Sequence, residues 1–363
     1  MTQKFIGILV SPSVYNGIKD GETYYEELPF YEEAATDLQM VPCYFRLKDI
    51  NPNEDQLKAI IKQSNGKYKL REVPKPLVIH NRIFTKTNFA KEKIKLLQEK
   101  GIFIFNENNR YSKLEIYNIL IKNEELVPHI PETCVCTREN VMYMMDKYRE
   151  LILKPNSGSL GFGIIKLTQL TDQKWEMSYV QNNLLKRLMF KGLWPKKLKQ
   201  IASDSKWIVQ ERIQLASSRE RPFDLRVSVQ KNGTGNWQVS GIVGKVAEKG
   251  SFITNVAQGG ACYPLFELLV DISQQDKEKK YQDIGNVSIK IAQQLEKEIP
   301  NLGDLGLDIG ITNEGKPMFI ECNGRDLRVT FRNANMLEEW KNTHATPIRY
   351  ANYLYKVKTK INE

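Results

Sequence analysis

Residues 305–324, LGLDIGITNEGKPMFIECNG, decide the fold because they contain two short apolar strands joined by the turn NEGK. The first predicted strand carries Asp308, and the second carries Glu321 and Asn323. In an antiparallel hairpin these three oxygen ligands meet at one end. Mg²⁺ prefers oxygen ligands and keeps positions open for water and phosphate, so the hairpin indicates a metal-nucleotide site. The alternative is three polar side chains at strand ends beside a turn.

A second informative segment is LILKPNSGSLGFGIIKL at 151–167, where one apolar run ends near Lys154 and another resumes after a glycine-rich loop. The pattern predicts strand, loop and strand. Glycines let the backbone approach a polyphosphate, and the N–H groups of such a loop attract anions. We therefore expect residues 156–162 to be mobile without nucleotide and to close over bound Mg-ATP. A glycine-rich turn without a ligand is the alternative.

Six motifs along the chain resemble, in their order, those of the ATP-grasp superfamily. They are Lys113 in RYSKLEIYNIL, Lys154 in ILKP, the SGSLGFG loop, QERI at 210–213, Asp224-x-Arg226, and Asp308 with Glu321-x-Asn323. Within the superfamily, the stretches RPFDLRVSVQ, GKVAEKGSFITNVAQGG and FIECNGRD are most similar to the YheC/YheD-type group, which is associated with bacterial endospore coats. The resemblance covers about residues 105–360.

The resemblance implies a set of ATP-binding and metal-binding residues. The lysines and the loop would hold phosphates, and the QERI strand would bind adenine and ribose. The ATP-binding residues implied are Lys113, Lys154, Ser157, Gly158, Ser159, Gly161, Gln210, Glu211, Arg212 and Ile213. Two Mg²⁺ ions would be held by Asp308, Glu321 and Asn323.

The same resemblance implies catalytic and substrate-binding residues. Arg226 would stabilise the acyl phosphate or the tetrahedral species, because a guanidinium binds such oxygens in a bidentate way, and Lys245 would assist. For Arg226 the alternative is an ion pair with Asp224 on one strand face. The candidates for substrate binding are Arg82, Asn255, Gly259, Gly260, Arg325 and Arg328. A turn is the alternative for the two glycines, and an unpaired surface position is the alternative for the last two arginines.

The fold class expected is α/β and α+β, with an N-terminal parallel-sheet (pre-ATP-grasp) domain before a two-lobed ATP-grasp fold. Strands predicted at 5–10, 41–45, 76–83 and 101–106 alternate with helices at 28–39 and 89–100, which favours a mainly parallel sheet. Ser112 is expected to cap the helix that carries Lys113. The domains expected are 1–108, the central lobe at 109–205 and the C-terminal lobe at 206–363.

Composition favours a cytoplasmic enzyme. At 363 residues the chain is long enough for two or three domains, and no stretch approaches 18 consecutive apolar residues. The five cysteines form no Cys-x-x-Cys pair, so buried reduced thiols are expected. His80 is expected to be a satisfied buried side chain.

The net charge of +10 does not by itself indicate nucleic-acid binding, because basic and acidic residues are interleaved and no nucleic-acid partner is expected. The densest basic run, KRLMFKGLWPKKLKQ at 186–200, could suit an acidic partner, a membrane surface or RNA. A helical insertion in the ATP-binding half is the preferred interpretation.

The function implied is an ATP- and Mg²⁺-dependent ligase that activates a carboxylate as an acyl phosphate for attack by an amine or another nucleophile. Its partners would be a small-molecule or peptide carboxylate and that nucleophile. A kinase is one alternative. A spore-coat-associated protein that binds nucleotide without turnover is another, and an association with spores is left open.

Overall fold

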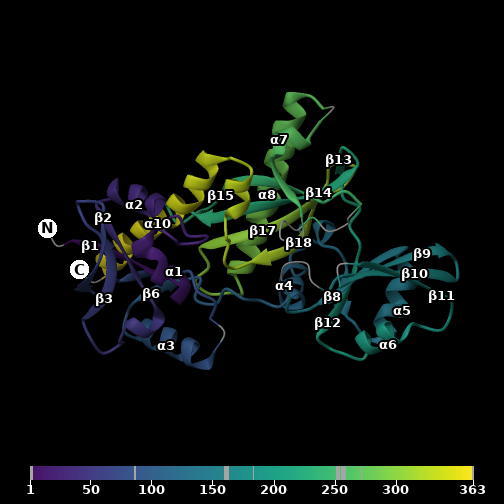
Figure 1. Cartoon of the computed structure of the whole chain (residues 1–363), viewed down its shortest axis with the longest axis horizontal. Coiled ribbons are helices and arrows are strands. Elements are labelled where there is room, and N and C mark those ends of the chain that lie inside the picture. The colour runs from purple at the N-terminus through teal and green to yellow at the C-terminus, as the bar shows by residue number, and fades with distance from the viewer. Residues whose placement is uncertain are drawn as a thin grey trace.

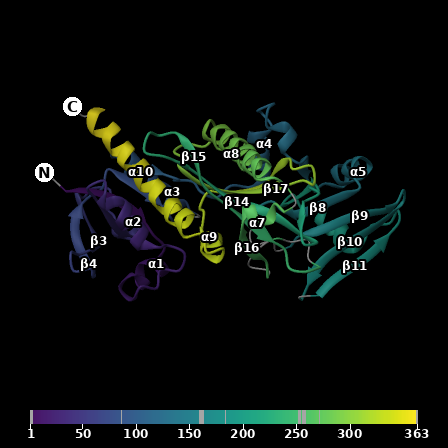
Figure 2. The same ribbon diagram turned by 90° about the horizontal axis from the view of Figure 1, so that it is seen from above.

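The computed structural model describes residues 3–85, 87–158, 163–182, 184–250, 254, 259–270 and 272–361. Three sheets lie along the long axis of the molecule (Figure 1). The sheet built by the last strands of the chain lies between the other two, in both views (Figures 1 and 2). The third sheet can therefore form sites with both of its neighbours.

The N-terminal sheet has the order β4-β3-β2-β1-β5-β6. Its parallel strands are β1 (Lys4–Leu9), β2 (Met40–Phe45), β5 (Val78–Asn81) and β6 (Phe103–Phe105), which confirms the mainly parallel sheet expected. An antiparallel hairpin of β3 (Gln56–Lys62) and β4 (Tyr68–Pro74) extends one edge. The hairpin was not predicted, because most side chains of β4 are exposed and its sequence shows no apolar alternation.

Strand β1 is buried on both faces, which explains its continuous apolar sequence. Ile6 and Ile8 pack in a cluster with α2 (Leu28–Thr36) and the long C-terminal helix α10 (Leu337–Ile361). Phe5 and Leu9 pack on the other face with α3 (Asn88–Glu99). Short helices at α1 (Pro12–Gly17), Ile18–Asp20 and Leu47–Asp49 complete this domain.

The central-lobe sheet is antiparallel, with the order β11-β10-β9-β8-β12-β7. Its core packs against α5 (Arg138–Lys147) and α6 (Lys196–Ile201). The strands are β7 (Thr133–Val135), β8 (Glu150–Pro155), β9 (Ile165–Thr171), β10 (Lys174–Gln181), β11 (Leu184–Phe190) and β12 (Trp207–Glu211). As predicted, Lys154 lies at the C-terminal end of a strand.

This sheet corrects one expectation and bears on the proposed domain division. The basic run at 186–200 is not one helical insertion: its first part is the edge strand β11, which pairs with β10 along its whole length, and only its last part is helical. Strand β12 lies after residue 206 yet pairs with β7 and β8. The domain division remains a proposal, and this pairing favours a boundary after residue 211.

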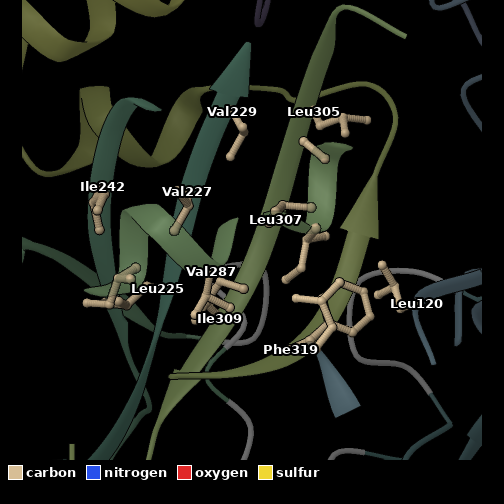
Figure 3. Packing of buried hydrophobic residues seen from close by; sticks show 14 of the residues in the cluster. Leu120, Leu225, Val227, Val229, Ile242, Val287, Leu305, Leu307, Ile309 and Phe319 are labelled. Carbon is tan, nitrogen blue, oxygen red and sulfur yellow. The ribbon is translucent and has the colours of Figure 1, made fainter. Parts of the chain in front are cut away.

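The third sheet contains β14 (Arg221–Lys231), β15 (Trp237–Val246), β16 (Ala261–Pro264), β17 (Asp304–Ile311) and β18 (Pro317–Asn323), with β13 (Ser217–Ser218) beside β14. One face packs against α4 (Lys113–Leu120) and α8 (Gln274–Glu296). Figure 3 shows this core, in which Leu225, Val227, Leu307 and Ile309 come from neighbouring strands. Ser112 caps α4 as expected, accepting from the backbone N–H of Glu115 at 3.1 Å.

The C-terminal helix α10 packs against the N-terminal domain. It follows α9 (Val329–Asn333) and runs along α2 of the N-terminal domain (Figure 2). Two other short helices, Val127–His129 and α7 (Leu265–Leu268), lie earlier in the chain. The buried α10 residues Ile348 and Ala351 belong to the same apolar cluster as β1. The C-terminal lobe therefore includes a helix that completes the N-terminal core.

Composition and structure agree on two further points. All five cysteines are free thiols, and Cys43, Cys136 and Cys262 are buried. In the described part of the chain, every helix is too short or too polar to cross a lipid bilayer.

Candidate nucleotide and metal site

The candidate site lies on the polar face of the third sheet. Strand alternation buries Leu225, Val227, Leu307 and Ile309 on the α8 side, so the residues between them point to the opposite face. The cross-strand register pairs the polar residues of that face: Asp224 with Lys245, Arg226 with Asp308, and Asp308 with Glu321. The sequence thus places one charged row across four adjacent strands.

The proposed metal ligands meet on this row. Asp308 and Glu321 are direct cross-strand partners, and Asn323 pairs with Gly306 one step further along the hairpin. Two carboxylates and an amide oxygen are a donor set that suits Mg²⁺. Within the described residues, no group of three or more His, Cys, Asp and Glu side chains is arranged to hold a metal. An ion here would therefore need further oxygens, such as those of nucleotide phosphates.

Cations surround Asp308. Its Oδ1 accepts from Arg226 Nε at 2.8 Å and lies 3.1 Å from Lys245 Nζ. Although burial opposes ionisation, Arg226 and Lys245 hold the pKa of Asp308 below its ordinary value. The Asp308 carboxylate is therefore ionised, and the positive charges of Arg226 and Lys245 already compensate its negative charge.

The Asp224–Arg226 ion pair, which was the alternative to a catalytic role for Arg226, does not form. Asp224 instead lies 3.1 Å from Lys245 Nζ and accepts from Thr254 Oγ1 at 2.7 Å. Arg226 turns to Asp308 and to Asp326, with Nη1–Oδ1 at 2.9 Å. The reason is the register, because each of the two residues has an oppositely charged neighbour directly across the ladder.

Two lysines face this row from the central lobe and α4. Lys113 Nζ lies 3.3 Å from Glu321 and donates to the carbonyl of Gly158 at 2.7 Å. Lys154 is only 7% exposed and donates to Gln210 Oε1 at 2.8 Å. Burial, together with the nearby charge of Lys113, lowers the pKa of Lys154 to about 8, against the opposing effect of Glu321 and Asp308. Lys154 is a buried cation without a carboxylate of its own within ion-pair distance in the described chain.

A small enclosed cavity lies between the two lobes beside these lysines. One side is apolar, and the other presents the two ammonium groups and Glu321. Its lining is Tyr111, Ser112, Lys113, Ile116, Tyr117, Ile130, Lys154, Gln210, Phe319, Ile320, Glu321 and Cys322. Its apolar walls at one end and cations at the other suit an aromatic base and its phosphates, but the cavity, about 20 Å³, is smaller than a nucleotide in this structure.

Of the four QERI residues at 210–213, only Gln210 has a side chain that lines the cavity. Gln210 lines the cavity and is fixed by Thr133, whose Oγ1 accepts from its Nε2 at 2.7 Å. The guanidinium of Arg212 is bound to Glu150 at 2.6 Å, and the Glu211 carboxylate accepts from the Glu132 backbone N–H at 3.3 Å. The cavity lining contains neither these two side chains nor Ile213.

The structure describes the start of the glycine-rich loop, residues 156–158. The Asn156 side chain accepts from the backbone N–H of Leu114 at 2.9 Å, and its carbonyl accepts from that of Lys113 at 3.0 Å. The loop base is thereby joined to the first turn of α4, a contact that sequence analysis missed. Ser157 and Gly158 follow, whereas Ser159 and Gly161 lie outside the described residues, as does the rest of the predicted lid.

The remaining substrate candidates separate into two groups. Gly259 has a φ of +89°, which favours a turn role, and Gly260 directly precedes β16. Asn255 lies outside the described residues. Arg82 and Arg328 are fully buried, which excludes the unpaired surface alternative for Arg328.

The two buried arginines join the N-terminal domain to the third sheet. Arg82 Nε donates to Glu26 at 2.9 Å, and its Nη1 donates to Asp304 at 3.2 Å. Arg328 binds Asp304 and donates to the hydroxyl of Tyr31 at 2.7 Å. These bonds favour a structural role for both arginines. The ion-pair network was not visible in the sequence, because its members come from positions far apart in the chain.

His80 belongs to the same network and is buried as expected, but it is not fully satisfied, because its Nδ1 has no hydrogen-bond partner among the described residues. It lies 3.2 Å from Asp304 and stacks on Phe105 with ring centroids 4.4 Å apart. Burial lowers the pKa of His80 to about 4, so the imidazole is neutral at physiological pH.

Arg325 differs from the other arginines of this region. Its Nη1 donates to the backbone carbonyl of Arg82 at 3.2 Å, and its guanidinium lies 3.9 Å from the ring centroid of Phe84. Within the described residues no carboxylate lies within ion-pair distance of Arg325. It is a partly buried cation beside the β17–β18 hairpin.

A lysine-bearing cavity between an antiparallel central lobe and a carboxylate-bearing hairpin defines an ATP-grasp protein. The family model described as YheC/D-like ATP-grasp matches residues 101–354. The chain belongs to this YheC/D-like ATP-grasp family, which confirms the resemblance seen in the motifs.

Two relatives from Bacillus subtilis (strain 168) match along most of their length. The endospore coat-associated protein YheD is 24% identical over 358 residues, which cover 94% of this chain and 76% of that protein. The endospore coat-associated protein YheC is 22% identical over 318 residues, which cover 85% of this chain and 86% of that protein.

Solved structures share the fold. The ATP-grasp ligase PsnB, in complex with a minimal precursor, has a TM-score of 0.53 and 14% identity over 92% of this chain and 95% of its own. D-alanyl-alanine synthetase A from Vibrio cholerae has a TM-score of 0.50 and 13% identity over 99% and 98% of the two chains. Another PsnB structure contains Mg and ADP, again with a TM-score of 0.50. The ATP-grasp fold expected from the sequence is thereby confirmed.

Proposed function

We propose that the chain is an ATP- and Mg²⁺-dependent ligase that activates a substrate carboxylate. The observation that carries the proposal is a cluster of cations: Lys113, Arg226 and Lys245 contact the carboxylates of Asp308 and Glu321, and Lys154 lies beside them. Phosphoryl transfer depends on charge neutralisation and positioning more than on covalent help from the protein. Family membership and the fold shared with ligases support the same reading.

The residues take distinct roles in this proposal. Lys113 and Lys154 bind phosphate oxygens, which replace the Gly158 carbonyl and the Gln210 side chain as acceptors. Gln210 borders the base, and the backbone of residues 211–213 binds its edge. Asp308, Glu321 and Asn323 would hold two Mg²⁺ ions, which would neutralise phosphate charge when bound.

The proposed reaction has two steps. A carboxylate oxygen of the substrate attacks the γ-phosphorus, and ADP leaves; an amine or another nucleophile then attacks the acyl carbon, and phosphate leaves. In this proposal Arg226 stabilises the oxyanion of the tetrahedral species. Asp308 and Asp326 fix its Nε and Nη1, while Nη2 has no hydrogen-bond partner in the described residues, which supports this role. Lys245 supplies a second positive charge on the same row.

The substrate is proposed to be a small molecule or a peptide with a carboxylate. Arg325 supports this, because a partly buried guanidinium without an acidic partner would gain from binding an anionic group. Arg82 and Arg328 would act indirectly, by holding the N-terminal domain against the hairpin.

Hydroxylamine trapping tests the proposal. The protein is incubated with Mg-ATP, hydroxylamine and a panel of amino acids and aspartate- or glutamate-containing peptides, and ADP and hydroxamate are both measured. A ligase gives hydroxamate in step with ADP, because hydroxylamine intercepts the acyl phosphate. ADP with a phosphorylated hydroxyl product and no hydroxamate would establish the kinase alternative. Nucleotide binding without ADP would establish the binding protein without turnover.

A spore association is proposed because the relatives YheD and YheC are endospore coat-associated proteins. A fluorescent fusion followed through sporulation in the source organism tests it. A signal that stays uniform in the mother cell and is absent from purified spores would reject the association.

A further inference from the structure

The outer edge of the central lobe is an apolar strand that, among the described residues, pairs on one side only. β11 is the last strand of its sheet and lies at the far end of the molecule from the N-terminal domain (Figures 1 and 2). Leu184, Leu185, Leu188 and Met189 are 60%, 46%, 40% and 54% exposed. Exposed apolar edge strands are uncommon, because their free N–H and C=O groups can pair with another chain. Such an edge calls for an explanation.

The charges of this edge are confined to its middle. The sequence LLKRLM at 184–189 places Lys186 and Arg187 between two apolar pairs. Among the described residues neither cation has a carboxylate within 4.0 Å. Lys186 lies across the ladder from Tyr179, and Lys197 of α6 covers that ring at 3.9 Å. Positive charge therefore gathers at the centre of the edge.

Strand alternation repeats the same pattern on both faces. Leu184, Lys186 and Leu188 point to one face, and Leu185, Arg187 and Met189 point to the other. A membrane surface or an RNA backbone would contact one face and leave the other exposed. An added strand covers both faces and also satisfies the free backbone groups.

We propose that β11 docks an extended peptide segment whose core reads apolar-apolar, acidic-acidic, apolar-apolar. The two acidic side chains would lie opposite Lys186 and Arg187, one on each face, and the apolar pairs would cover the exposed leucines and Met189. Opposite charges directly across a ladder stabilise strand pairing, and like charges oppose it. A second copy of this chain is disfavoured for that reason, because antiparallel pairing of two β11 strands would bring their basic pairs together.

A designed peptide tests this proposal. The probe is a fluorescein-labelled decapeptide with the core valine-valine-glutamate-glutamate-valine-valine between glycine-serine ends, and binding is followed by fluorescence anisotropy. One control has the glutamates at the two ends of the core, a second has lysines in their place, and a third is N-methylated at alternate residues. We expect the probe to bind at least about ten-fold more tightly than each control.

A charge exchange makes the test independent of general basicity. The double variant K186E/R187E should no longer bind the glutamate probe and should instead bind the lysine peptide. The control K19E/K279E changes the net charge by the same amount at exposed positions elsewhere and should bind peptides as wild type does. An unfolding temperature of K186E/R187E equal to that of wild type would show that the charge exchange leaves the fold intact.

Each other outcome overturns the proposal. Equal binding of all peptides would show only nonspecific charge attraction. Binding to anionic vesicles or to single-stranded RNA that K186E/R187E abolishes, without peptide discrimination, would assign the edge to lipid or RNA. Concentration-dependent dimers lost in the variant would assign it to self-association. If no probe binds, the role of Lys186 and Arg187 would be only to prevent this edge strand from aggregating. ADP release does not enter this test, so its result is separate from that of the proposed ligase activity.

Discussion

Arg226 and Asp326 form a buried ion pair, with 2.9 Å between Nη1 and Oδ1, that joins strand β14 to the loop after β18. Asp326 is fully buried, and its other oxygen accepts from Ser228. Its backbone carbonyl accepts from Arg82 at 2.7 Å. Asp326 thus links the proposed catalytic arginine to the interface with the N-terminal domain. Gly306 makes room for the pair, because a Cβ there would lie 2.8 Å from Asp326 Cγ and 3.0 Å from Arg226 Nη1.

Replacing Asp326 should therefore affect turnover more than ATP binding. Asp326→Asn removes the charge that fixes Nη1 of Arg226, so we expect a lower kcat with little change in the KM for ATP, and a loss of roughly 1–3 kcal/mol of stability. Gly306→Ala should have the same effect by displacing the pair, while Asp37→Asn on the surface serves as control. A loss of stability with unchanged kcat would make Asp326 a structural residue only.

The metal assignment predicts a charge-dependent loss at Glu321. Glu321→Gln keeps the volume of the side chain and removes its charge, so Mg-ATP affinity or ADP formation should fall while the unfolding temperature changes little. The matched control is Glu298→Gln, which breaks a comparable pair with Lys122 at 2.8 Å on the surface. Mg²⁺ titrations that coincide for wild type and Glu321→Gln would reject Glu321 as a ligand.

Lys154 should contribute far more to nucleotide binding than an exposed lysine. Lys154→Ala removes a buried charged donor, and losing one such hydrogen bond to phosphate costs about 1.5–3 kcal/mol. Calorimetry should show a correspondingly larger dissociation constant, with Lys279→Ala as the surface control. If both variants bind ATP equally well, Lys154 is only a partner of Gln210.

The lowered pKa of Lys154, about 8, predicts how nucleotide affinity depends on pH. Below pH 8 the free protein carries the charged ammonium, which binds phosphate; above pH 8 it must first take up a proton. Affinity should thus fall as the pH rises from 8 to 9.5, with net proton uptake on binding. Calorimetry at pH 8.5 in buffers of different ionisation enthalpy measures this uptake. It should be absent in Lys154→Met, and an equal uptake there would assign the proton to another group.

The sequence alone determined the features that depend on short stretches of chain. The hairpin pattern in 305–324 brought Asp308, Glu321 and Asn323 to one end, the apolar run before Lys154 placed that lysine at a strand end, and Ser112 was recognised as a cap. The direct pairing of Asp308 with Glu321 depends on a bulge between Asp308 and Ile309 that strand alternation does not predict. Motif order gave the family, because six weak patterns in one order are far more specific than any one of them.

Only the tertiary structure decided which charges meet. Asp224 and Arg226 are two residues apart and point to the same face, yet each pairs with a neighbouring strand, and Arg82 and Arg328 come together at Asp304 from opposite ends of the chain. The free edge of β11 likewise appears only once the sheet order is known. The physical reason is that alternation and capping act over a few residues, whereas ion pairing, burial and sheet edges depend on which distant segments become neighbours.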